Sequence, residues 1–141
     1  MKKNEISIDD YPLRQKRSDL LFTHNGVNIN DITFENIYAG VLSRDECRIS
    51  KDSLILQAKI ADDIGNTHLA GNFRRAAEMI EIESDRIIEI YNALRPYRST
   101  EGELRKVVKE LKEKYNATIT ATFIEEAIII MKERKRLKGD R

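Results

Sequence analysis

The residue types that carry out catalysis or bind metals are few in this sequence, and they are scattered. The two histidines, His24 and His68, lie far apart, and neither belongs to a metal-binding pattern such as His-Glu-x-x-His. Cys47 has no histidine near it in the sequence that could activate a thiolate. Asp62 and Asp63 are adjacent, and adjacent helical residues do not share a face, so they predict a solvated surface. The sequence therefore predicts no catalytic residue, no metal site and no cofactor-binding residue in this chain.

Arginines are concentrated in the stretch 71–99, GNFRRAAEMIEIESDRIIEIYNALRPYRS. The planar guanidinium of arginine suits paired, desolvated contacts with carboxylates at protein interfaces. We therefore interpret Arg74 and Arg75 as anchors for the carboxylates of a partner. The alternative is an intrahelical pair between Arg74 and Glu78, which has the weaker orientation. The basic run 132–138 lies at the end of an expected helix, where cations complement the helix dipole; nucleic-acid contact is the less favoured interpretation.

Length and composition bound the class of protein. The 141 residues suffice for one domain with a modest core, and the absence of Trp makes that core aliphatic. The net charge of +1 argues against a nucleic-acid-binding protein. A single cysteine rules out an intrachain disulfide and fits a reducing cytoplasm. No signal peptide is expected, because the start MKKNEISIDDYPL lacks an apolar run, and no segment is long enough to span a membrane.

The first part of the chain predicts little regular structure. Residues 1–10 are polar and are expected to form a loose tail. Asn25-Gly26 between apolar residues predicts a hairpin with a type I′ turn. Residues 33–40 predict a short helix with Thr33 as N-cap, Gly40 after its end, and Phe34, Ile37 and Tyr38 for packing. We therefore expect an extended arm over 1–45, with a turn and one short helix, and a helical domain over 46–141.

Apolar spacing predicts helices in the remainder. Residues 51–66 follow the N-cap Ser50, and glycines predict a break between about 65 and 71. Two short helices follow, joined by an elbow at 81–84, and Pro96 stops the second. Thr100-x-x-Glu103 has the form of a capping box and opens the most regular helix. The expected fold is all-α, a small open bundle of about three to five helices with an extended, largely irregular N-terminal arm.

The last segment can be read in two ways. Residues 117–122 alternate and could form a strand, whereas Thr122-x-x-Glu125 has the form of a capping box and would open a helix to about Leu137. Over 128–131 this helix would be apolar nearly all round. A terminal helix of so small a domain cannot bury all of these side chains, so part of it is expected to meet another chain.

Several motifs together carry a resemblance to a known family. They are DYPL at 10–13, DIT at 31–33, RIS at 48–50, NFRRAAE at 72–78, and IYNALRP at 90–96 followed by Arg98-Ser99. In this order they strongly resemble the small (gamma) subunit of adenosylcobalamin-dependent diol and glycerol dehydratases, from about Asp10 to Arg134. Where members of that family often carry Pro, this chain has Glu83, so Ser84 is expected to cap the following helix. The short segment before Asp10 favours the glycerol-type enzyme or a non-encapsulated one.

The resemblance implies a role within a larger enzyme. Large and medium subunits would be the partners of this chain in a heterohexamer, a dimer of heterotrimers. The complex would dehydrate glycerol or 1,2-propanediol to an aldehyde by radical chemistry. Adenosylcobalamin would be held by the other subunits, and the substrate site and its metal ion would lie in the large one. The small subunit would be mostly helical and pack on the large subunit, in the cytoplasm or within a bacterial microcompartment, away from nucleic acid and membrane.

We accordingly expect this chain to stabilise the complex without taking part in catalysis. The residues expected at the partner interface are Tyr11, Pro12, Leu13, Phe73, Arg74, Arg75, Tyr91, Arg95 and Tyr97. The alternative is a free-standing helical adaptor or regulatory protein that has the same fold and a different partner.

Overall fold

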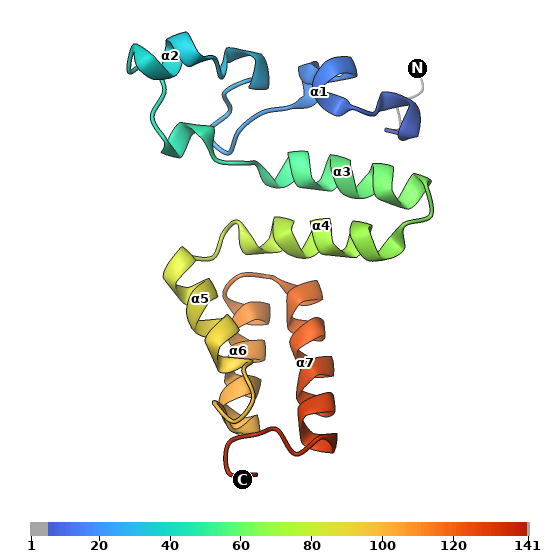
Figure 1. Ribbon diagram of the computed structural model, residues 1–141, viewed down its shortest axis with the longest axis vertical. Helices are drawn as coiled ribbons and strands as arrows, with labels where there is room; N and C mark the ends of the chain where they lie inside the picture. The colour runs from blue at the N-terminus through green and yellow to red at the C-terminus, as the bar shows by residue number, and fades with distance from the viewer. Residues whose placement is uncertain (1–5, 141) are drawn as a thin grey trace. The chain divides into compact units, whose positions relative to one another are not determined.

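The computed structural model describes residues 6–140 and confirms the all-α class (Figure 1). The described residues contain seven α-helices, five of them ten residues or longer, and no strand. The helices are α1 (Leu13–Lys16), α2 (Phe34–Tyr38), α3 (Lys51–Asp63), α4 (Thr67–Met79), α5 (Ser84–Ala93), α6 (Glu101–Glu113) and α7 (Thr118–Glu133). Short 3₁₀ turns, among them η1 (Ile8–Asp10) and η4 (Asp45–Cys47), occupy much of the irregular N-terminal part.

The chain forms two compact units, Met1–Ala77 and Glu78–Arg141, called unit 1 and unit 2 below. The boundary falls near the end of α4. The division predicted from the sequence, an arm over 1–45 and a helical domain over 46–141, has a different boundary and stays a prediction.

Unit 1 is built on α3 and α4, which run side by side (Figure 1). The hydroxyl of Ser50 accepts a hydrogen bond from the Ser53 N–H and caps α3, as predicted. Small side chains allow the close approach of the two helices: Ala58, Ala61 and Ala70 are buried, and Phe73 packs on them. The break between the helices covers only 64–66, so the predicted weakening up to 71 was too long. Gly71 lies inside α4 and does not break it. A glycine in a helix interior lowers helix stability by only about 1 kcal/mol relative to alanine, so the helix continues through it.

The N-terminal part of unit 1 is more ordered than the expected loose tail. Residues 1–5 of that prediction lie outside the described residues. Beyond them, Ser7 and Asp10 form a capping box around η1. The Ile8 N–H then donates to Asp63 Oδ2 at 2.8 Å, across 55 residues of sequence. These bonds hold the segment against the end of α3.

The predicted turn at Asn25-Gly26 is present but is not of type I′. The Thr23 N–H donates to the Val27 carbonyl at 2.8 Å, and the Gly26 N–H to the Thr23 carbonyl at 3.0 Å. Gly26 has φ +83°, whereas Asn25 is not in the left-handed region that a type I′ turn requires. One residue with positive φ after a tight turn gives a three-residue loop, so the interpretation as a two-residue loop was wrong.

Unit 2 has the larger core. It forms where α6 packs against α7, with α5 beside them (Figure 1). The most deeply buried large side chains are Leu104, Leu111, Ile124 and Ile128. Thr100 and Glu103 form the predicted capping box at the start of α6. Residues 117–122 could have formed a strand or part of a helix. They are helical from Thr118 on, because α7 begins at that residue.

Glu78 explains why α7 begins so early. Its carboxylate accepts hydrogen bonds from the N–H of Ile119 (2.9 Å), the N–H of Thr120 (2.7 Å) and the Thr120 hydroxyl (2.8 Å). A helix start has unsatisfied N–H groups and a positive dipole end, so a carboxylate there is stabilising. The predicted cap at Thr122 was therefore wrong, and its hydroxyl instead donates to the Thr118 carbonyl.

Substitution of Glu78 by alanine is expected to lower the free energy of unfolding by about 1–2 kcal/mol, because two N–H groups of the α7 start lose their acceptor. Urea unfolding of the full chain, followed by circular dichroism, measures the change. Glu81→Ala is the matched control, since Glu81 is exposed and lies in the elbow between α4 and α5. Equal stability of the two variants would show that Glu78 does not cap α7.

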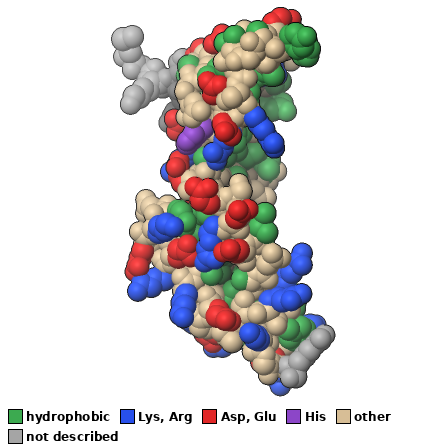
Figure 2. Space-filling view, turned by 90° about the vertical axis from the view of Figure 1, so that its left-hand side faces the viewer, with side chains coloured by type: hydrophobic (Ala, Val, Ile, Leu, Met, Phe, Trp, Pro, Cys, Tyr) green, Lys and Arg blue, Asp and Glu red, His purple; other side chains and the backbone are tan. Residues whose placement is uncertain are grey.

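Ion pairs join the helices of unit 2 over its surface. Arg86 on α5 donates through Nη2 to Glu110 Oε2 on α6 at 2.6 Å and through Nη1 to Glu89 at 2.6 Å. Hydrogen bonding to Glu110 raises the pKa of Arg86, and the same guanidinium lowers the pKa of Glu110. Figure 2 shows basic and acidic side chains intermixed over the visible face, and the sequence has 25 Lys and Arg residues against 24 Asp and Glu residues.

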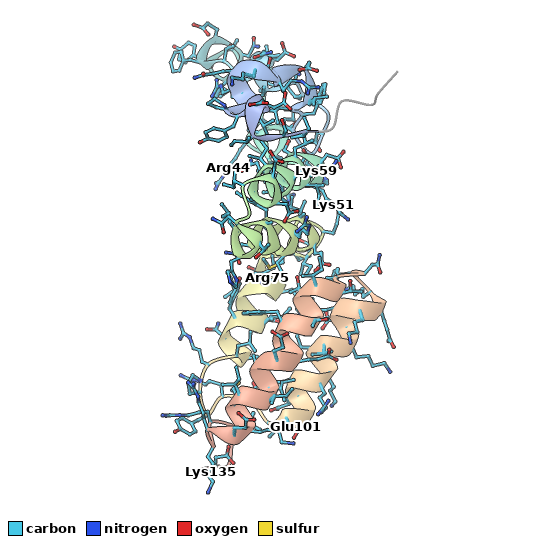
Figure 3. The ribbon with its side chains drawn as sticks, turned by 90° about the vertical axis from the view of Figure 1, so that its right-hand side faces the viewer. Arg44, Lys51, Lys59, Arg75, Glu101 and Lys135 are labelled. Carbon is cyan, nitrogen blue, oxygen red and sulfur yellow. The ribbon has the colours of Figure 1, made fainter. Side chains whose placement is uncertain are left out.

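Glu101 at the start of α6 (labelled in Figure 3) lies between two cations. Its carboxylate contacts Lys132 of α7 at 2.9 Å and Arg105 at 2.6 Å. Lys132 and then Arg105 lower the pKa of this carboxyl. The pKa of Glu103 is lowered as well, by the hydrogen bond from the backbone of Thr100.

These shifts predict the pH dependence of stability. A carboxyl whose pKa is lower in the folded state stabilises the fold above its unfolded pKa, about 4.3 for Glu, and this contribution is lost as the pH falls through the folded pKa. We expect the urea midpoint of the full chain to be flat from about pH 5 to 7 and to fall below about pH 4. Glu110→Gln should make the acid fall shallower. A stability that rises toward acid pH would contradict this assignment.

Candidate partner interface

The residues whose side chains could act in catalysis or bind a metal lie apart in the structure. Among residues 6–140, no group of three or more His, Cys, Asp or Glu side chains is placed to hold a metal ion. Cys47 is a free, half-buried thiol in η4, and both histidines are exposed. Asp62 and Asp63 are engaged by Arg74 and by the Ile8 N–H respectively. Within the described residues, the structure does not bring the histidines and Cys47 together with the two aspartates.

Unit 1 contains an apolar groove of about 520 Å³. Its walls come from η1 and the segment after it, from α3 and from the start of α4. The lining residues are Ile8, Tyr11, Leu13, Arg14, Leu21, Gln57, Ile60, Ala61, Ile64, Leu69 and Phe73. We call this feature the unit 1 groove.

Three of the predicted interface residues meet in the unit 1 groove: Tyr11, Leu13 and Phe73. Leu13 is buried at the start of α1, whereas the Tyr11 side chain is 60% exposed. Phe73 reaches the groove from α4, where its other contacts are the small alanines of the α3–α4 pair. Pro12, between Tyr11 and Leu13 in the sequence, is half-buried and does not line the groove. An exposed tyrosine over a wall of aliphatic carbon is typical of a protein-binding surface.

The charged groups around the groove are mostly satisfied within the chain. Arg74 pairs with Asp62 of α3, so the alternative of an intrahelical pair with Glu78 was wrong. Arg75 (labelled in Figure 3) donates to the Asn72 side chain one turn earlier. Arg14 differs, because it lines the groove and makes no ion pair or hydrogen bond with a described residue through its side chain. A carboxylate of a bound partner would therefore find a cation at the groove.

The other predicted interface residues lie in unit 2. Tyr91 on α5 is exposed, as is Arg95 after the end of that helix. Tyr97 is half-buried and is held by Arg136, which donates to the Tyr97 hydroxyl at 2.8 Å. The Tyr97 N–H also donates to the Arg136 carbonyl at 2.7 Å. Tyr97 thus ties the chain after α5 to the chain after α7, while Tyr91 and Arg95 remain open to a partner.

The expected N-cap of α5 was misplaced by one residue. Glu83 occupies the N-cap position and makes no side-chain cap, and Ser84 is the first helical residue. The Ile87 N–H bonds to the Glu83 carbonyl at 3.0 Å, so backbone geometry alone opens the helix.

Two apolar surfaces lie outside the nine residues expected at the partner interface, and the second belongs to the C-terminal helix, part of which was expected to meet another chain. On α2, Phe34 and Tyr38 are 75% and 84% exposed, and their rings stack with centroids 5.8 Å apart. The expectation that they pack within the chain was wrong, since helical spacing defines a stripe without defining what covers it. On α7, Ile129 and Ile130 are exposed while Ile128 and Met131 are buried. Exposed apolar groups of this size are typical of interaction sites.

Comparison with known proteins places the chain among dehydratase subunits. Residues 6–138 match the family described as "Dehydratase small subunit". The propanediol dehydratase small subunit of Citrobacter freundii is 45% identical over 133 residues, which are 94% of this chain and 77% of the relative. The propanediol dehydratase small subunit of Salmonella typhimurium (strain LT2) shows the same identity and coverage. Within residues 6–140, no helix is both long and apolar enough to cross a membrane.

Proposed function

The chain belongs to the dehydratase small-subunit family, and we propose from this that it is the small, non-catalytic subunit of an adenosylcobalamin-dependent diol or glycerol dehydratase. Its role is to stabilise the complex by packing on the large subunit. The observation that carries this proposal is the match of the family along residues 6–138. The alternative of a free-standing adaptor is not favoured, because its relatives with 45% identity are themselves dehydratase subunits.

The proposed partners are a large and a medium subunit in a dimer of heterotrimers, in the cytoplasm or in a bacterial microcompartment. Both named relatives belong to propanediol dehydratases, which makes 1,2-propanediol the first substrate to test and glycerol the second. When bound in such a complex, adenosylcobalamin supplies the radical that starts the dehydration. The catalytic residues belong, in this proposal, to the other subunits.

The residues that line the unit 1 groove do not fit the cofactor. A corrin ring carries many amide side chains and needs polar partners, whereas the unit 1 groove is lined by aliphatic and aromatic carbon with Arg14, Gln57 and the Tyr11 hydroxyl as its polar groups. Neither histidine lines it. This supports assigning cobalamin to the other subunits and a purely structural task to this one.

The structural task follows from surfaces that the chain leaves open. In unit 1, Ile8, Tyr11, Ile64 and Leu69 are exposed and line the same groove. Covering apolar surface is favourable by about 25 cal/mol per Å², so a partner side chain seated in this groove would stabilise the complex. The proposed interface thus keeps Tyr11, Leu13 and Phe73 as its centre, with Arg74, Arg75, Tyr91 and Arg95 as further contacts.

Co-expression tests the proposal. A tagged version of this chain is produced with the large and medium subunits encoded in the same genome, and native mass spectrometry of the purified material gives the subunit composition. We expect all three subunits in equal amounts, with two copies of each per complex. Purification of this chain by itself, with the other two subunits forming their own complex, would favour the adaptor alternative.

Arg74→Ala combined with Arg75→Ala is expected to weaken assembly with the large subunit and to leave the helicity of the full chain nearly unchanged. The Arg74–Asp62 pair is exposed, and such pairs contribute at most about 1 kcal/mol to folding. Quantitative co-purification measures the effect. Lys51→Ala with Lys59→Ala is the matched control, because it removes two charges from exposed positions of α3 (Figure 3). Equal recovery of both variants would remove Arg74 and Arg75 from the interface.

A further inference from the structure

The solvent-facing side of α7 carries an apolar strip. Ile119, Phe123 and Ile130 are 40%, 46% and 47% exposed. With 3.6 residues per turn, these three positions fall within about 40° of one another around the helix axis and span about 16 Å along it. The opposite side of α7 carries Ile124, Ile128 and Met131 into the core of unit 2. The helix α7 therefore lacks the usual polar outer side, because its buried side and its exposed side both carry apolar residues.

Two carboxylates run beside this strip. Glu126 and Glu133 are seven residues apart, so they lie on one line along the helix, next to Ile119 and Ile130. Neither makes a hydrogen bond or an ion pair with another described residue through its side chain. The other acids of α6 and α7 are all engaged inside unit 2: Glu101 with Arg105 and Lys132, Glu103 with Thr100, Glu110 with Arg86, Glu113 with Lys109 and Glu125 with Lys112.

This distribution of charge specifies the chemistry of an occupant. Unit 2 also carries cations at the end of α7, yet the folded chain brings none of them to Glu126 or Glu133 within the described residues. A surface that combines exposed isoleucine and phenylalanine with two uncompensated carboxylates is complementary to an apolar ridge flanked by cations. An amphipathic helix presents such a ridge with its apolar residues three and four apart.

We propose that the face formed by Ile119, Phe123, Glu126, Ile130 and Glu133 binds a helix of a partner dehydratase subunit that carries Lys or Arg along one flank of its apolar ridge. The inference rests on the proposed function, and it adds a second contact surface with a stated charge. Arg134 follows at the C-terminal end of the face. An acid on the partner helix opposite Arg134 would fix the direction in which that helix lies.

A second copy of this chain is a poorer occupant. A two-fold interface brings the same surface patch of both copies together. Glu126 and Glu133 of one copy would therefore meet a face that carries the same two carboxylates and no cation among Ile119, Phe123, Glu126, Ile130 and Glu133. Like charges placed opposite each other across an interface oppose binding.

Binding of the purified full chain to separately purified large and medium subunits, mixed to reconstitute the complex, tests the inference. The charge-reversal variant Glu126→Lys/Glu133→Lys is expected to bind at least about tenfold more weakly at about 0.05 M salt, and the difference should shrink at about 0.5 M salt. The neutral variant Glu126→Gln/Glu133→Gln should lie between it and the unmodified chain. Ile130→Gln should weaken binding several-fold at both salt concentrations, since it removes apolar contact.

Controls separate this surface from general effects. Glu81→Lys/Glu113→Lys makes the same charge change at exposed positions outside α7, and Ile49→Gln makes the same apolar change at an exposed position of unit 1. Both should bind like the unmodified chain, and circular dichroism should show equal helicity for all variants. If the unmodified chain does not bind the other subunits, the proposed function fails. If it binds and the α7 variants bind equally well, only this inference fails. A dimer of the chain alone that Ile130→Gln dissociates would also overturn it, in favour of a second copy.

Discussion

Replacement of Leu111 by alanine is expected to lower the free energy of unfolding of the full chain by about 2–5 kcal/mol. Leu111 lies on α6 and is fully buried in the core that α6 forms with α7. Removal of its side chain loses the transfer free energy of the buried carbon and leaves a cavity that the surrounding helices cannot fill completely. Urea unfolding followed by circular dichroism gives the change directly.

Leu111→Met is the matched control for this prediction. Methionine nearly conserves the volume of leucine and adapts its shape, so the loss should stay below about 1.5 kcal/mol. A loss of less than about 1 kcal/mol for Leu111→Ala would show that α6–α7 packing contributes little to the stability of the chain. Similar losses for both variants would point to a requirement other than volume.

Leu69→Glu is expected to weaken assembly with the large subunit by about 30-fold or more, which corresponds to the loss of an interface residue worth about 2 kcal/mol. Leu69 lines the unit 1 groove and is exposed in the free chain. A carboxylate at this position would have to be buried when an apolar side chain occupies the groove. It lies in the first turn of α4, where an acid favours the helix dipole, so the free chain should remain stable. Titration of the large and medium subunits with the purified chain measures the effect.

His68→Glu is the control for Leu69→Glu. It introduces the same carboxylate in the same helical turn, at an exposed residue that does not line the groove. Unchanged affinity is expected. If both substitutions weaken binding equally, the effect is a general electrostatic one. If both variants bind as tightly as the unmodified chain, the interface lies elsewhere on the chain.

Features set by nearby residues could be predicted from the sequence. The caps Thr33, Ser50 and Thr100 each bond to an N–H three residues ahead, so the motif and the structure involve the same short segment. Gly40 follows α2 with φ +71°, a conformation that glycine adopts without strain. The all-α class followed from the same local patterns.

Features set by distant residues could not be predicted. Glu78 and Thr120 are 42 residues apart, and Ile8 and Asp63 are 55 apart, so no spacing rule connects them. The true start of α7 depends on the first of these contacts, and the order of the segment around η1 on the second. The prediction of a cap at Thr122 failed for this reason, and so did the part of the loose-tail prediction that falls on residues 6–10.

The interface residues illustrate the same limit. Tyr11, Leu13 and Phe73 were selected because they belong to motifs that resemble a known family, and the structure brings them into one groove. Their neighbours Ile60 on α3 and Ile64 just after its end show the same helical spacing as core residues, and nothing in the sequence separates the two roles. On α2 the spacing was right and the assignment to packing was wrong, because the stripe of Phe34 and Tyr38 faces solvent.

We propose that a dehydratase depends on this chain for its assembly. The most direct test of this dependence is aldehyde formation from 1,2-propanediol and from glycerol, with adenosylcobalamin, by large and medium subunits purified with and without this chain. We predict that the three-subunit complex is intact and active, and that the preparation without this chain loses both integrity and most of its activity. Two subunits that assemble and turn over equally well without it would contradict the claim.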